Sequence, residues 1–174
     1  QAIRVPRLCN TDAASGLMDT FDLNAARAEQ LSQVVEGNIA AALRMQNSEG
    51  VGADYGLFVR WMRACYGQDS ATMVELAEEV SKMGREAMKR FFIYSMHMVR
   101  QCIVGNYGAM ELVRLTDEER GFAEKFAPFI HHDNVVALQA LLEKAHRDIA
   151  GNVNGRLVFL DLSVQVNILL RKTA

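Results

Sequence analysis

A glycine-asparagine corner followed by three alanines is the segment of this chain best suited to meet a phosphate group. Gly37 can adopt the left-handed conformation that ends a helix, and the Asn38 side chain can cap the helix that follows. Ala40 and the two alanines after it would let another backbone or a ligand phosphate approach closely. Arg44 lies one helical turn beyond Ala40 on the same face, where it brings a positive charge. The segment therefore predicts two helices joined at a tight corner.

A group of basic residues is the second candidate for a binding site. Lys82, Arg85 and Lys89 follow one another at helical spacing and are extended by Arg90, which predicts a basic stripe. We favour a solvated helix face, because lysine and arginine are mostly exposed. A contact with a partner subunit or a phosphate is the alternative, since a local patch is enough for electrostatic attraction.

Two groups of residues could bind a metal ion. Glu143 and His146 share one helix face, as in di-iron bundles, but such bundles need a second Glu-x-x-His and the sequence has none. His131, His132 and Asp133 stand at a junction between predicted helices. Adjacent histidines in a helix point about 100° apart, so we expect no shared metal there, and we expect Asp133 to cap the next helix. No phosphate loop or nucleophile elbow occurs.

The elements that must position these residues are predicted to be helices. Half of the 174 residues are hydrophobic and only two are proline, which favours an all-α fold. Apolar spacing predicts helices over residues 11–21, 24–36, 39–46, 53–66, 70–83, 85–105, 116–130, 133–150 and 154–172.

The last of these helices conflicts with its own pattern. Apolar and polar residues alternate from Val158 to Ile168, which taken alone predicts a strand. We nevertheless predict a helix, because the sequence offers no other strand after residue 10 to pair with this segment. A long unpaired strand would invite aggregation. Residues 2–8 alternate as well and are expected to form a short edge strand, whose partners we place in a missing N-terminal part.

Composition limits the class of protein. The net charge of −2 argues against a nucleic-acid-coating protein, and no apolar run is long enough to span a membrane. Three separated cysteines predict reduced thiols in a cytosolic protein.

Gln1 is not an initiator methionine, so we expect a piece of a longer protein. Two glycines within residues 47–53 predict a linker there, and hence two domains, residues 1–48 and 49–174.

Several segments resemble the clamp-loader subunits of the AAA+ family, in that family's order and spacing. Residues 1–8 are similar to the strand after the sensor-1 region, and residues 21–23 (Phe-Asp-Leu) and 28–44 to the helices of the lid domain. Residues 98–101 (Met-Val-Arg-Gln) resemble part of the central helix of the collar domain, and residues 152–162 its last helix. Together these segments touch most of the chain.

The resemblance implies a small helical lid over residues 1–48, whose first eight residues are a remnant of the ATPase module, and a helical-bundle collar over residues 49–174. Subunits of this family join through their collars in a ring that loads the sliding clamp onto primed DNA. The implied role is therefore structural, in the cytoplasm, with gamma/tau-type and delta-type subunits as partners. The clamp and the DNA would be reached only through the whole complex, and neither cofactor nor metal is implied.

Ala40 selects among the subunits of that family. In the ATP-hydrolysing type an arginine at this position reaches the phosphates of the nucleotide. Alanine has neither charge nor reach, so it cannot neutralise developing phosphate charge; Arg44 could substitute only in part. The resemblance thus implies a degenerate nucleotide-sensing motif made of Gly37, Asn38, Ala40 and Arg44, and no catalysis by this chain.

Two other classes stay open on the sequence. Residues 24–44 have the outline of a helix-turn-helix DNA-binding regulator, although the residues after the corner offer no base-reading side chains. An all-α metalloenzyme built around Glu143 and His146 is the other alternative.

Overall fold

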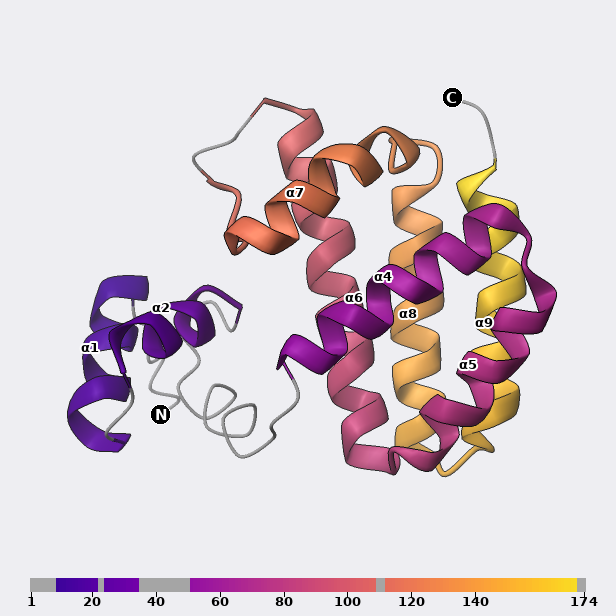
Figure 1. Ribbon diagram of the computed structural model, residues 1–174, viewed down its shortest axis with the longest axis horizontal. Coiled ribbons are helices and arrows are strands. Elements are labelled where there is room, and N and C mark those ends of the chain that lie inside the picture. The colour runs from indigo at the N-terminus through magenta and orange to yellow at the C-terminus, as the bar shows by residue number, and fades with distance from the viewer. Residues whose placement is uncertain (1–8, 22–23, 35–50, 109–111, 172–174) are drawn as a thin grey trace, which may run out of the picture. The chain divides into compact units, whose positions relative to one another are not determined.

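A computed structural model of the chain describes residues 9–21, 24–34, 51–108 and 112–171 (Figure 1). Within these ranges every regular element is a helix and no strand occurs, so the predicted all-α fold class is confirmed. The chain divides into two compact units. The smaller unit is Gln1–Val51 with Arg114–Thr116, and the larger unit is Gly52–Val113 with Asp117–Ala174.

The smaller unit contains a pair of helices, α1 (Asn10–Phe21) and α2 (Ala25–Val34), which pack against each other. Their shared core holds the buried side chains Ala13, Leu17, Ala28 and Leu31. Ala25, the first residue of α2, is exposed. The predicted strand over residues 2–8, the corner at Gly37 and the helix over residues 39–46 lie outside the described residues, as does the boundary expected after residue 48.

The larger unit is a helical bundle. Its elements are α4 (Val51–Gly67), α5 (Ser70–Lys82), α6 (Arg85–Asn106), α7 (Asp117–Phe126), the 3₁₀ helix η2 (Ala127–Phe129), α8 (Val135–Ala150) and α9 (Gly155–Leu170). Helices α6, α8 and α9 lie side by side, with α8 in contact with both others, and α5 packs on α9 (Figure 1). None of the helices in the described ranges is long and apolar enough to cross a membrane.

Helix α4 crosses this layer and supplies the centre of the core. The Trp61 ring lies 5.0 Å from that of Phe159 on α9 and 5.7 Å from that of Phe91 on α6, measured between ring centroids. Its indole N–H donates to the Ser163 hydroxyl across 2.8 Å. All four side chains are fully buried. A buried indole N–H needs such an acceptor, so this bond ties α4 to one rotational setting of α9.

A buried ion pair joins α4 to α6. The Arg90 guanidinium donates through Nε to one Asp54 oxygen at 2.7 Å and through Nη2 to the other at 3.2 Å. The Asp54 side chain is fully buried, whereas Arg90 is partly exposed. Burial raises the pKa of the Asp54 carboxyl, and the Arg90 hydrogen bonds and charge oppose that rise.

The conflict over the last helix is resolved in favour of the helix. Asn154 caps α9, its side-chain oxygen accepting from the Leu157 amide at 3.2 Å. The buried positions then recur at spacings of three and four: Val158, Phe159, Leu162, Ser163, Val166 and Leu170. The alternation in the sequence arises because α9 has apolar residues on its outward face as well.

Two expectations about local structure were wrong. Residues 51–53 of the predicted linker form the first turn of α4. The helix expected to reach residue 130 changes to 3₁₀ geometry after Phe126, next to Pro128, which has no amide to donate.

Candidate functional site

The outward face of α9 carries an apolar stripe. Leu157, Val164 and Ile168 are spaced seven and four residues apart, so they share one helix face, and they are 63%, 50% and 62% exposed. Asp161 lies between them on the same face and is exposed. A helix that is apolar on two faces is normally covered on both. We call these three residues the α9 stripe.

A groove runs beside the stripe, between α8 and α9. It has a volume of ≈ 200 Å³ and is lined by Leu141, Lys144, Ala145, Asp148, Val153, Leu157, Val158, Asp161, Leu162 and Gln165. The floor is apolar, and the charged residues are Lys144, Asp148 and Asp161. One cation and two carboxylates leave a net charge of −1 along the groove. Lys144 is already paired with Asp148 at 2.6 Å.

The predicted basic stripe is not a single helix face. Lys82 is the last residue of α5, whereas Arg85 and Lys89 belong to α6. Gly84 separates the two helices with a φ of 84°, a left-handed conformation that favours glycine. The chain therefore turns between the cations that the sequence spacing had placed in one row.

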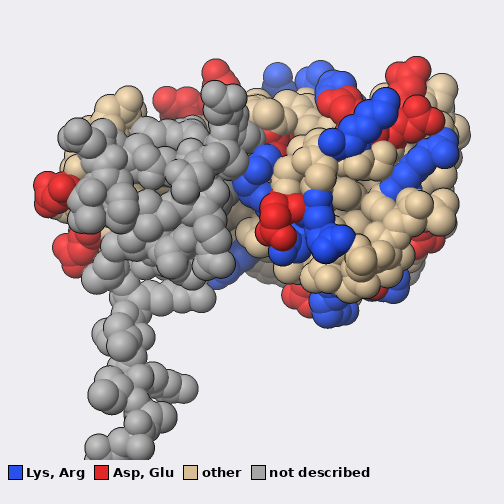
Figure 2. All heavy atoms as spheres, turned by 90° about the horizontal axis from the view of Figure 1, so that it is seen from below, with Lys and Arg blue, Asp and Glu red and all other residues tan. Residues whose placement is uncertain are grey.

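Most of these cations have local partners. Lys89 pairs with Glu86 at 2.7 Å, Arg85 donates to the Asn152 side chain, and Arg90 is bound to the buried Asp54. On the face of the larger unit shown in Figure 2, lysines and arginines lie among aspartates and glutamates. Three of these four cations therefore have a partner within the larger unit. Contact with a phosphate or a partner stays a prediction.

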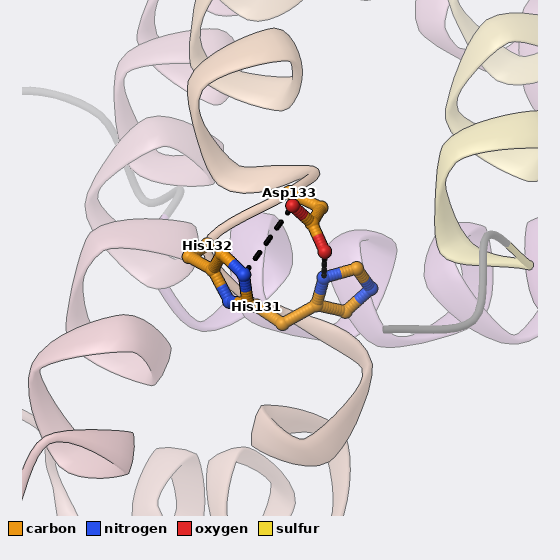
Figure 3. Close-up of side chains that lie close together, drawn as sticks. All are labelled: His131, His132 and Asp133. Carbon is orange, nitrogen blue, oxygen red and sulfur yellow. Dashed lines mark ion pairs between the residues drawn. The ribbon is translucent and has the colours of Figure 1, made fainter.

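The turn before α8 brings three metal-ligand side chains together. His131 Nδ1 lies 3.9 Å from one Asp133 oxygen, and His132 Nε2 lies 3.3 Å from the other (Figure 3). In the described part of the chain this is the only group of three or more such residues whose donor atoms lie within 4.8 Å of one another. Asp133 does not cap α8 as expected, because the N-cap is Asn134.

Glu143 and His146 are not joined by a third donor among the described residues. Glu143 is exposed and lies 3.8 Å from Arg147 Nη1, one turn along α8. His146 is partly buried, and burial together with the charges of Lys89 and Arg147 lowers its pKa. This pair therefore has the surroundings of a helix surface.

The three cysteines differ in how accessible their thiols are. Cys9 is exposed, whereas Cys65 and Cys102 are buried, and none forms a disulfide. Burial raises the pKa of each buried thiol to about 12, which leaves it protonated and unreactive near neutral pH.

The residues of the lid motif, Gly37, Asn38, Ala40 and Arg44, lie outside the described residues.

Comparisons with protein-family models, with curated proteins and with solved structures found nothing that matches this chain. Sequence reasoning missed the α9 stripe, although its signal was present: the apolar residues of α9 exceed what one buried face needs.

Proposed function

We propose that this chain is a non-catalytic structural subunit of the bacterial DNA polymerase III clamp loader, of the delta-prime type, and that it assembles through its larger unit. The α9 stripe carries the proposal. Single exposed apolar side chains are common on protein surfaces and need no explanation. A row of them beside an apolar groove is instead typical of a surface that another protein covers.

The occupant that fits best is the collar of a gamma/tau-type subunit. The groove is lined by residues between 141 and 148 and between 153 and 165, so a partner helix laid along α8 and α9 would contact it. Its net charge of −1 and the exposed Asp161 within the stripe favour a partner helix that carries lysine or arginine among its apolar residues. The resemblance of residues 152–162 to the last helix of a collar supports the same assignment.

Positive charge placed in the stripe should weaken this assembly. The double variant Val164→Lys, Ile168→Lys is expected to weaken binding to a gamma/tau-type collar at least tenfold, about 1.4 kcal/mol or more, because two ammonium groups would be desolvated and would face the basic residues proposed for the partner. Isothermal titration calorimetry against the purified collar measures the effect.

Val136→Lys is the matched control, since that valine is more exposed than either stripe residue and lies on α8. It should bind as the wild type does. Equal loss in the control, or full binding by the double variant, would contradict docking through the α9 stripe.

The absence of catalysis has its own test. Because Ala40 offers no charge at the position where the family's ATPases carry arginine, the chain alone should bind a fluorescent ATP analogue only weakly and should release no phosphate. Tight, saturable binding of the analogue would exclude the proposed non-catalytic role even if the collar interaction were found.

A further inference from the structure

We infer that His131, His132 and Asp133 form a binding site for a divalent transition-metal ion of the zinc type. The site lies in the turn between η2 and α8, on residues that the proposed clamp-loader role does not use. Two imidazoles and one carboxylate are ligands that zinc accepts, and three protein ligands leave a coordination position for water.

The turn overcomes the geometric objection to adjacent histidines. In a helix the two side chains would diverge by about 100°. Here residues 131–134 are not helical, and the two rings flank the Asp133 carboxylate from either side (Figure 3). The ring centroids are 6.2 Å apart with planes at 69°, so neither ring blocks the other.

The donor atoms already stand near coordination distances. Ligands at about 2.0–2.1 Å from a tetrahedral ion lie about 3.3–3.4 Å from one another. The two carboxylate oxygens lie 3.3 Å and 3.9 Å from the nearest imidazole nitrogens. Side-chain rotations that move these atoms by less than about 1.5 Å would complete a site whose widest donor separation is below 4.8 Å.

Asn134 holds the turn in this shape. It is fully buried, and its side-chain oxygen accepts from the His131 amide at 3.0 Å. Its side-chain amide donates to the carbonyl oxygens of Phe129 at 2.8 Å and Leu169 at 3.2 Å. The backbone that carries the three ligands is thus fixed against two other elements, so a metal would not have to order it.

The chemistry of the donors selects the ion. Imidazole nitrogen suits Zn²⁺, Ni²⁺ and Cu²⁺, whereas Mg²⁺ and Ca²⁺ need sites built from oxygen. Solvent reaches the site because His132 and Asp133 are exposed. The N-terminus of α8, which begins at Val135, carries a partial positive charge that opposes a cation, so micromolar rather than nanomolar affinity is expected.

Titration of the untagged, metal-free chain with Zn²⁺ in a calorimeter tests the inference. One equivalent should bind with micromolar affinity, and Mg²⁺ should give no binding heat. His132→Ala and Asp133→Asn should each weaken Zn²⁺ binding about tenfold or more. Both side chains are exposed, so neither change should unfold the protein.

His146→Ala and Glu143→Gln are the matched controls, because they remove the same chemical groups from α8 and should leave Zn²⁺ binding unchanged. Co²⁺ supplies a second readout, since ligation by two imidazoles and a carboxylate in a four-coordinate site gives visible d–d absorption that the His132→Ala variant should lose. No Zn²⁺ binding by the wild type, or equal binding by both site variants, would overturn the assignment.

Discussion

Replacing Arg90 by methionine should destabilise the larger unit by about 3–5 kcal/mol, because it would leave the buried Asp54 carboxylate without its partner. The Asp54 side chain is fully buried and receives two hydrogen bonds from Arg90, at 2.7 Å and 3.2 Å. Losing one partner of a solvent-exposed ion pair destabilises a protein far less, because water solvates the charge that is left. The free energy of unfolding from urea denaturation measures the change.

The matched control is Arg60→Met. Arg60 pairs with Glu79 at 2.6 Å, but both side chains are about half exposed, so its loss should cost no more than about 1 kcal/mol. The double variant Arg90→Met, Asp54→Asn should recover part of the loss, since it removes the orphaned charge. Similar losses from Arg60→Met and Arg90→Met would contradict the assigned difference between the pairs.

The loss in Arg90→Met should also depend on pH. Burial raises the folded-state pKa of Asp54 above its ordinary value of 3.8, so the native state binds the proton more tightly than the unfolded chain does. The stabilisation that results is complete below about pH 3.8 and disappears as the pH rises through the folded-state pKa. Without Arg90 that pKa rises further, so the deficit of the variant relative to wild type should grow from pH 4 towards neutrality. A deficit that does not change with pH would contradict this account.

Replacing Phe159 by alanine should cost about 3–5 kcal/mol, from lost burial and the cavity left behind. Phe159 is fully buried, with its ring 5.0 Å from Trp61 and 6.1 Å from Phe91. Alanine is the better helix former by about 0.5 kcal/mol, which is too little to offset that loss. Trp61 is the chain's one tryptophan and packs directly on Phe159, so its fluorescence emission reports the unfolding transition of the variant.

Ile168→Ala is the control on the same helix. Ile168 is 62% exposed in the α9 stripe, so the change should alter the free energy of unfolding by no more than about 0.5 kcal/mol. If Ile168→Ala and Phe159→Ala destabilised the protein equally, the assignment of inward and outward faces of α9 would be wrong.

Local sequence signals predicted the helices well. Asp117 opens α7 directly after Thr116, and α5, α6 and α8 begin within two residues of their predicted starts. Caps, glycine breaks and apolar spacing act over four residues or fewer, so a sequence displays them directly. The same signals failed for Asp133, because five residues separate η2 from α8 and the N-cap is Asn134.

The buried ion pair between Asp54 and Arg90 could not be read from the sequence. The two residues are 36 positions apart, and both are ordinary charged residues on predicted helices. Arg90 was grouped with Lys82, Arg85 and Lys89 by spacing alone. Only the packing of α4 on α6 shows that its charge is directed inward and is not available to a ligand.

By itself the sequence determined that this chain folds as helices and that it carries no phosphate loop or nucleophile elbow. Tertiary structure decided which apolar face of α9 is buried against Trp61 and which is left as the α9 stripe. It also decided that His131, His132 and Asp133 meet in a turn. Helix formation depends on neighbours within a few residues, whereas a buried face depends on which segments the chain brings together from far apart. The turn that carries the three ligands is likewise held by a distant contact, the hydrogen bond from Asn134 to the Leu169 carbonyl oxygen.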